Sequence, residues 1–287
     1  MKNTALILEG GGFRGLFTSG VLDYFLENQI KFPYVIGVSM GACNGASYIS
    51  NQQGRNKIVN IDFVKDSRYM SYRRLFLKGE LFGMNFIFND IPNGIVPYDF
   101  KTYEDSAQIF KMVVTDIKTG QPVYLEKGDG TTLMDALQAS ASLPFISKPV
   151  WIAGRPCLDG GISDSIPINK ALEDGNDKIV VILTQPREFV KTESKSNKLA
   201  KYWYKEYPVM ERLLNSRHEN YNRARAQIFE LEKQGRAFII EPPHKIPAGR
   251  IEKDKKVLID SFEMGYKEAN RTSDELKRFL LDTESQY

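Results

Sequence analysis

Three short motifs contain residue types that together could hydrolyse an ester. The first is Gly37-Val38-Ser39-Met40-Gly41, which matches the pattern G-x-S-x-G. A serine in this pattern can stand on a sharp turn with its hydroxyl exposed, while the flanking glycines let neighbouring backbone approach closely. A helix that begins after the serine directs backbone N–H groups and its positive dipole end toward an oxyanion. We therefore expect Ser39 to be a nucleophile, although the pattern alone also fits a structural serine in a glycine-rich turn.

The second motif is the glycine-rich run Gly10–Gly15, with the sequence GGGFRG. Consecutive glycines after a strand form a nest of free N–H donors that suits an oxyanion hole beside Ser39. The run also satisfies G-x-G-x-x-G, the pattern of dinucleotide-binding loops. That interpretation needs an acidic residue near the end of the next strand, and no Asp or Glu lies between Glu27 and Asp62. The sequence therefore favours the oxyanion hole.

The third motif, Leu158-Asp159-Gly160-Gly161, contains a candidate base for the serine. Taken alone, Asp-Gly-Gly is a turn signal. A partly desolvated carboxylate has a raised pKa and could take the serine proton directly. The order Ser39, Asp159, His244 also satisfies the chain order of an α/β-hydrolase triad, which leaves a second interpretation. A dyad of Ser39 and Asp159 is favoured, because Ser39 follows an early strand and His244 is expected in a loop beside prolines.

Buried strands and amphipathic helices must position these motifs. Residues 5–8 and 34–38 are short apolar runs typical of buried strands, and residues 16–26 and 40–49 have helical spacing. This β-loop-α-β-turn-α unit predicts a mainly parallel sheet with the nucleophile on a strand-turn-helix elbow. Further strands are expected at 111–114, 122–125, 178–183 and 236–240, and further helices at 132–142, 205–234, 253–270 and 273–282.

The three motifs, in this order, resemble those of the patatin-like phospholipase family, particularly its small bacterial members. Further matches are Asp116 with Thr119-Gly120, and the run Ala139–Pro144 shortly before the third motif. The resemblance covers about residues 5–185. It implies a three-layer α/β/α fold with a mainly parallel central sheet. Glu9 replaces the Asp, Ser or Gly that many relatives have before the three glycines, which changes little if backbone donors hold the oxyanion.

The resemblance also implies residue roles and an activity. It implies a catalytic dyad of Ser39 and Asp159, and an oxyanion hole built from backbone N–H groups of Gly10, Gly11, Gly12 and Met40. The residues that support these motifs are Arg14, Gly15, Gly37, Gly41, Gly160 and Gly161. The expected activity is hydrolysis of acylated lipids, of the phospholipase A, lysophospholipase or esterase type, without a metal or cofactor. A thioesterase and a non-catalytic lipid-binding protein are the alternatives.

Composition limits the possible partners and organisation. The chain has 287 residues, 42% of them hydrophobic and 26% charged, which is ordinary for a globular protein. We expect a single domain, with a C-terminal, mostly helical extension at about 190–287. A net charge of +3 gives no argument for nucleic acid, though it would tolerate an anionic membrane surface. The two cysteines form no disulfide framework. The N-terminal apolar run is too short for a signal peptide, so we expect a cytoplasmic protein.

Residues 62–90 contain many aromatic residues among basic ones. Tyr69, Tyr72 and Phe76 have the spacing of one helical face, and such a face could contact a membrane peripherally through acyl chains and phosphate groups. The favoured interpretation is an insert that packs into the core, with its basic residues in solvent. The lysine-rich residues 191–200 are expected to form a mobile loop.

Overall fold

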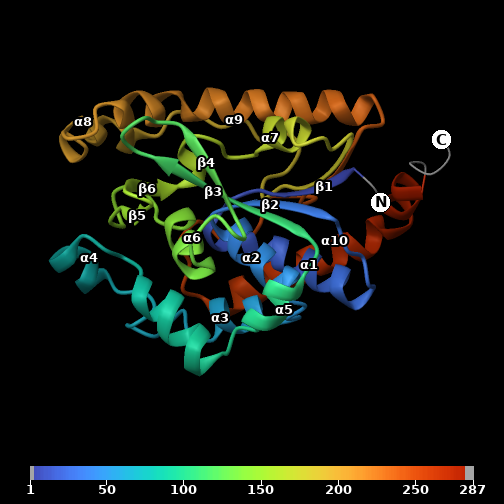
Figure 1. The fold of residues 1–287 in the computed structure, drawn as a ribbon, viewed down its shortest axis with the longest axis horizontal. Helices are drawn as coiled ribbons and strands as arrows, with labels where there is room; N and C mark the ends of the chain where they lie inside the picture. Colours follow the sequence, from blue (N-terminus) through green and yellow to red (C-terminus); the bar gives the residue numbers. More distant parts are fainter. Residues whose placement is uncertain (1–2, 282–287) are drawn as a thin grey trace.

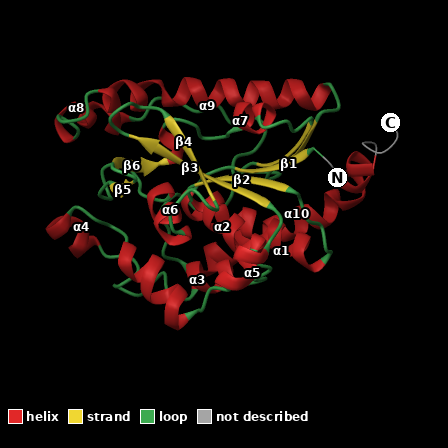
Figure 2. Ribbon diagram, viewed as in Figure 1, coloured by secondary structure: helices red, strands yellow, loops and turns green. Residues whose placement is uncertain are grey.

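A computed structural model describes residues 3–281, which form an eight-stranded sheet between two layers of helices (Figure 1, Figure 2). The strand order is β5-β6-β3-β2-β1-β7-β8, with β4 paired to β3. Strands β8, β7, β1, β2 and β3 are mutually parallel, and β4, β5 and β6 add antiparallel pairings. The strands are β1 (Thr4–Leu8), β2 (Tyr34–Val38), β3 (Ile109–Asp116), β4 (Pro122–Glu126), β5 (Val150–Ile152), β6 (Arg155–Asp159), β7 (Lys178–Ile182) and β8 (Ala237–Ile240).

The helices cover both faces of this sheet. In Figure 1, α7 and α9 lie on one side of the strands, and α1, α2, α6 and α10 lie on the other. The helices are α1 (Gly15–Glu27), α2 (Met40–Ile49), α3 (Arg55–Ile61), α4 (Tyr72–Lys78), α5 (Phe100–Asp105), α6 (Leu133–Ser140), α7 (Ile168–Glu173), α8 (Ala200–Trp203), α9 (Val209–Lys233) and α10 (Lys255–Leu281). A π-helix spans Phe86–Ile95, and short 3₁₀ turns span Gly12–Arg14, Gly160–Ile162 and Lys195–Leu199.

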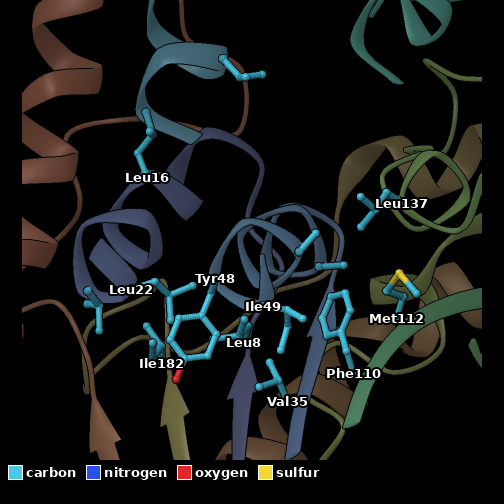
Figure 3. Packing of buried hydrophobic residues seen from close by; sticks show 14 of the residues in the cluster. Leu8, Leu16, Leu22, Val35, Tyr48, Ile49, Phe110, Met112, Leu137 and Ile182 are labelled. Atoms are coloured by element: carbon cyan, nitrogen blue, oxygen red, sulfur yellow. The ribbon is translucent and has the colours of Figure 1, made fainter. Parts of the chain in front are cut away.

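The sheet is covered on both faces, and its central strands β1 and β2 are buried at every position and almost entirely apolar. In β1, Leu6 and Leu8 join one core cluster with α1 and α2, while Ala5 and Ile7 join a second cluster with α7 and α9. This division follows from the alternation of side chains along a strand. Figure 3 shows the first cluster, in which Tyr48 and neighbouring residues fill the space between helices and sheet. These two cores hold the strand ends that carry the motifs.

The described structure confirms the predicted α/β architecture and corrects several elements. The strands and helices around the first two motifs lie within one residue of their predicted bounds. The hairpin of β5 and β6, which carries Asp159 at its end, was not predicted. The two helices expected at 253–270 and 273–282 form one continuous helix, α10, and residue 282 lies outside the described residues. The expected shared helical face of Tyr69, Tyr72 and Phe76 is wrong, because Tyr69 is buried in a turn before α4.

The C-terminal part of the chain packs directly on the N-terminal part. Strand β8 extends the parallel sheet beside β7, and α10 lies along α1. Gly20 of α1 and Gly265 of α10 let the two backbones approach, since a Cβ atom at either would collide with a carbonyl oxygen of the other helix. None of the helices within residues 3–281 has the length and apolar character needed to cross a membrane.

Candidate active site

Ser39 lies on the sharp turn between β2 and α2, with φ 56° and ψ −124°. A non-glycine residue rarely adopts this conformation, and it places the side chain outside the regular course of strand and helix. Hydrogen bonds hold the turn: the Ser39 N–H donates to Ser140 Oγ at 2.8 Å, and the Ser140 hydroxyl donates to Val113 O at 2.7 Å. The Ser140 bridge therefore ties the elbow to β3. In the sequence, Ser140 is only part of the matching run Ala139–Pro144, which does not indicate this role.

The two glycines that flank Ser39 are required by close packing. A Cβ atom at Gly37 would lie 2.7 Å from the backbone of Ala42, inside the elbow itself. A Cβ atom at Gly41 would collide with the carbonyl oxygen of Leu8, at the end of β1. The first approach closes the elbow, and the second brings the start of α2 against the end of β1, so the G-x-S-x-G pattern has a steric cause here.

The loop Gly10–Gly12 leads from β1 to α1 beside Ser39. A Cβ atom at Gly10 would lie 3.1 Å from Ser39 Cβ, and Gly12 has φ +58°. Among residues 3–281, no group accepts a hydrogen bond from the N–H groups of Gly10, Gly11 or Gly12. The N–H of Met40 is also free of intrahelical bonding because it opens α2. The four residues named for the oxyanion hole thus lie around the elbow.

Glu9 directly precedes the glycine loop and holds it in place through side-chain hydrogen bonds. Its buried carboxylate accepts hydrogen bonds from Thr184 N at 2.6 Å and from the Tyr221 hydroxyl at 2.9 Å. These contacts connect the end of β1 to the loop after β7 and to α9. Glycine at position 11 then lets the loop lie against Thr184, whose Oγ1 would be 2.8 Å from an added Cβ. No pattern in the sequence indicates this role for Glu9.

Asp159 ends β6 and is 2% exposed. Its backbone N–H donates to Ser142 O at 2.8 Å, and its carbonyl accepts from Thr115 Oγ1 at 2.9 Å. The carboxylate Oδ1 accepts from the N–H of Gly161 at 2.8 Å, while Oδ2 is buried without a hydrogen-bond partner in the described residues. Asp159 and Ser39 line the same cavity, of about 640 Å³. The structure therefore brings these two predicted residues together, with one carboxylate oxygen available as an acceptor.

Burial raises the pKa of Asp159 above its ordinary value, and four neighbours, among them Arg250, oppose this shift. Arg217 lowers it most, followed by the Ser39 hydroxyl and the N–H of Gly161. The hydroxyl is thus close enough to influence the carboxyl, although Oδ2 forms no hydrogen bond of good geometry. The hydroxyl therefore lies beside the carboxylate without a hydrogen bond to its Oδ2. A raised pKa suits a general base.

Ser39 lies at the junction of two cavities of different character. The cavity of about 640 Å³ that it shares with Asp159 contains Arg14, Lys191, Arg217 and Arg250. The second, of about 100 Å³, is mostly apolar, and its lining includes Phe13, Met40, Phe82, Phe88, Met134 and Leu137. Besides Ser39, Gly12, Leu143 and Arg250 border both. A substrate whose reacting carbonyl joins a polar to an apolar part would fit this arrangement.

Several residues of the basic cavity were missed by sequence reasoning. Lys191, Arg217 and Arg250 lie in segments without a motif, and only Arg14 belongs to the glycine-rich run. Residues 191–200, expected as a mobile loop, include a 3₁₀ turn, and the backbone of Lys191 bonds to α9. No periodic signal could have placed these side chains at Ser39.

The two histidines occupy different places. His244 is exposed and borders neither cavity, while His218 borders the basic cavity and its Nδ1 lies 2.8 Å from Asn215 O. Asp116, a further motif match, accepts from Lys118 N at 2.8 Å and shapes the turn after β3. Arg14 and Gly15 lie beside the elbow, where Gly15 leaves room for Met40. Gly160 allows close contact with Val113.

Comparison with known proteins adds relatives to this geometry. The model of the family described as patatin-like phospholipase matches residues 6–172, and a domain of unknown function (DUF6363) matches residues 207–281. An uncharacterized protein, YjjU of Escherichia coli, is 33% identical over 193 residues, which cover 66% of this chain and 54% of that protein. Lysophospholipase nte1 of Aspergillus terreus is 27% identical over 196 residues, covering 63% of this chain and 12% of the relative.

A solved structure has the same overall fold. VipD from Legionella pneumophila aligns with 95% of this chain and 66% of its own, at a TM-score of 0.50 and 12% sequence identity. At this identity the likeness concerns the fold alone. The chain spans only about half the length of the Escherichia coli relative, and a smaller part of the fungal one.

Proposed function

The chain belongs to the patatin-like phospholipase family, and from this premise we propose that it is a serine lipid acyl hydrolase with a Ser39–Asp159 dyad. The observation that carries the proposal is the position of Ser39 between a basic cavity and an apolar pocket. An acyl lipid has this division, because its ester carbonyl joins a hydrocarbon chain to a polar headgroup. The family and the lysophospholipase name of one relative support the same class of substrate.

The proposed reaction uses the free Oδ2 of Asp159. This oxygen takes the Ser39 proton as Ser39 Oγ attacks the ester carbonyl, and the N–H groups of the glycine loop and Met40 stabilise the oxyanion. The tetrahedral intermediate collapses, the alcohol leaves with the proton held by Asp159, and an acyl-enzyme remains. Asp159 then takes a proton from water, whose oxygen attacks the acyl carbonyl. The fatty acid leaves, and the proton returns to Ser39.

The apolar pocket is the proposed acyl site. Residues 62–90 supply Tyr69, Phe82, Met84, Ile87 and Phe88 to its wall, which supports a functional as well as a packing role for this insert. Helix α6 contributes Met134 and Leu137 to the same lining. An alkyl chain entering this pocket from Ser39 would gain the favourable free energy of removing apolar surface from water.

Two exposed apolar patches suit peripheral contact with a membrane. On α4, Phe76 and Leu77 are 90% and 64% exposed, and on α8 Trp203 is 56% exposed. Both helices lie at the same end of the molecule, on the left in Figure 1. The loop that borders the active-site cavity contacts both regions: Phe145 packs edge-to-face against Trp203, and the carbonyl of Ile146 accepts from the N–H of Leu81, which follows α4. Such patches, flanked by basic residues, are typical of interfacial binding.

Ser39→Ala tests the proposed activity. The variant should lose turnover of a short-chain nitrophenyl ester and of a lysophospholipid, while circular dichroism and the melting temperature stay close to wild type. Ser165→Ala is the matched control, because Ser165 borders the same cavity and donates to Gly161 O. We expect it to retain most of the activity. Hydrolysis by Ser39→Ala at the wild-type rate would refute the dyad.

His244→Ala tests the remaining triad interpretation. His244 is exposed and its Nδ1 lies near the carbonyl of Lys245, so we expect unchanged kcat/KM. A loss comparable with that of Ser39→Ala would instead favour a Ser-Asp-His mechanism.

A further inference from the structure

Four basic side chains line the cavity on the headgroup side of Ser39, and we call them the basic cluster: Arg14, Lys191, Arg217 and Arg250. Within residues 3–281, none of them has a carboxylate oxygen within 4.0 Å. The Nε of Arg14 is buried without a hydrogen-bond partner. Unpaired charges that share one cavity are costly unless an anion binds among them.

The carboxylates of this cavity do not neutralise the basic cluster. Glu9 is engaged by Thr184 N and the Tyr221 hydroxyl, and it supports the glycine loop. Asp159 is buried and assigned to the dyad. Glu193 is exposed and forms no ion pair with the cluster in the described structure. The cluster therefore presents an excess of positive charge to a bound molecule.

The members of the cluster are held in place before any ligand binds. Lys191 exchanges two backbone–side chain hydrogen bonds of 2.9 Å with Asn222, and its Nζ lies 4.3 Å from the centre of the Tyr221 ring. The Nε of Arg217 donates to Gly161 O. The carbonyl of Arg250 accepts from Phe13 N at 3.3 Å, which fixes its backbone against the glycine loop. Preorganised donors of this kind reduce the ordering cost of binding an anion.

The lowered pKa values of three members of the cluster also indicate that their positive charges are disfavoured in this cavity. Burial, followed by repulsion from Arg217 and Arg250, lowers the pKa of Lys191 well below its ordinary value, while Glu9 opposes this and Arg14 adds to it. Burial and Arg250 also lower the pKa of Arg217 to about 10, and burial lowers that of Arg14. An anion between these groups would replace the lost solvation and offset the repulsion.

We propose that the basic cluster is a subsite for a phosphate group, and that the enzyme prefers acyl lipids whose phosphate headgroup carries no compensating cation. The proposal rests on the proposed function, since it places this headgroup beside an ester attacked by Ser39. Arginine and lysine together suit phosphate oxygens, because guanidinium groups bind them bidentately and an ammonium binds as a point charge. A choline or ethanolamine group would bring a further positive charge into a cavity that already has an excess.

This subsite also assigns a task to the C-terminal segment. Arg217 and Arg250 lie in residues 207–281, the region matched by a domain of unknown function, and Lys191 lies between the two matched regions. Only Arg14 comes from the region of the three motifs. The N-terminal region thus supplies the proposed reacting groups, and the chain beyond residue 172 supplies three of the four basic side chains proposed to select the headgroup.

Kinetics with paired substrates test the proposal. We compare kcat/KM for a lysophosphatidic acid, the lysophosphatidylcholine with the same acyl chain, and a neutral nitrophenyl ester. Wild type should favour lysophosphatidic acid, and Lys191→Gln should reduce that kcat/KM by about tenfold, the value of one charge-assisted hydrogen bond. The neutral ester should change little, as should all substrates with the exposed control Arg212→Gln. Equal losses on all three substrates, or no wild-type preference, would overturn the proposal.

A binding measurement on Ser39→Ala separates this inference from the dyad. Calorimetry with glycerol 3-phosphate and with inorganic phosphate should show binding that weakens about tenfold or more in Ser39→Ala/Lys191→Gln. Absent binding, or binding unaffected by the second change, would refute the subsite even if hydrolysis is normal. If wild type hydrolyses no ester, the dyad fails and this binding still decides the subsite. If inorganic phosphate binds tightly but does not slow the hydrolysis of lysophosphatidic acid, the basic cluster is not a headgroup site.

Discussion

Residues 6–172 and residues 207–281 contribute to one cavity in different ways. In the first region, groups close together in sequence form the elbow, the glycine loop and the Asp159 turn. In the second, the long helix α9 and the loop before α10 bring single basic residues to the same place. The proposed reacting groups depend on particular backbone conformations, and short sequence motifs indicate these conformations. A positive charge, by contrast, can come from any basic side chain that is long enough and suitably placed, so no motif is needed for it.

The two regions also differ in what their packing specifies. The elbow depends on glycines that admit neighbouring backbone and on the bridge through Ser140. Helix α9 is mostly polar, and its buried residues, such as Tyr221 and Ile228, fix its rotation against the sheet. That rotation places Arg217 over Gly161. Changes in the first region should therefore affect the rate on every substrate, and changes in the second mainly the choice of substrate.

The largest effect is expected for Asp159→Asn. The amide cannot accept the Ser39 proton as a carboxylate does, so kcat/KM should fall by about a thousandfold on anionic and neutral esters alike. The measurement is steady-state hydrolysis at several pH values.

The matched control is Asp116→Asn, since Asp116 holds a turn and borders neither cavity at Ser39. Its rate per folded molecule should stay near wild type. An Asp159→Asn enzyme that loses activity on only one class of ester would break the division between the two regions.

A smaller but general effect is expected for Ser140→Ala. The change leaves the buried N–H of Ser39 without its acceptor, which costs about 1–3 kcal/mol of unfolding free energy. Chemical denaturation measures this loss, and kcat should fall on all substrates because the elbow is less well held. Ser142→Ala is the control, because its hydroxyl donates to Gln138 O instead of to the elbow. Equal kcat values in the two variants would argue against the bridge as a positioning device.

Phe76→Ser removes exposed apolar surface from α4 and changes no residue that lines either cavity at Ser39. Phe76 is 90% exposed, so folding should be unaffected, while binding to phosphatidylglycerol vesicles should weaken by about tenfold because less apolar area can be buried. Ile259→Ser, on α10, is the control. Vesicle sedimentation that is equal for both variants and wild type would contradict contact through α4.

The smallest expected change is a displaced pH profile in Arg217→Gln. Arg217 lowers the pKa of Asp159, so its removal should raise that pKa. In the proposed mechanism Asp159 acts as a base in its ionised form, so activity should be lost as pH falls through its pKa. The acidic limb of kcat/KM on the neutral ester should therefore move to higher pH. An acidic limb that stays at the same pH, or moves to lower pH, would show that Arg217 does not lower the pKa of Asp159.

The sequence predicted the fold and the motif-bearing elements well because their signals are local. Apolar runs of strand length and helical spacing define β1, β2, α1 and α2, and turn glycines mark their connections. The hairpin β5–β6 was missed because its strands are short and contain Pro156, which gives no strand signal. The spacing of Tyr69, Tyr72 and Phe76 misled because a turn interrupts it before α4.

The candidate site could be predicted only in part, for the same physical reason. Ser39, Asp159 and the glycines lie in patterns that their backbone conformations require. Glu9, Lys191 and Arg217 act through contacts between residues far apart in sequence, such as the bond between Glu9 and Tyr221. Charged residues at those positions look like ordinary surface residues until the sheet and α9 come together.

Labelling with a fluorophosphonate probe, followed by peptide mass spectrometry, tests the central claim most directly. The probe reacts with an activated serine, and the dyad predicts a single modified site at Ser39, formed much more slowly in Asp159→Asn. Modification at another serine, or equal rates in wild type and Asp159→Asn, would contradict it.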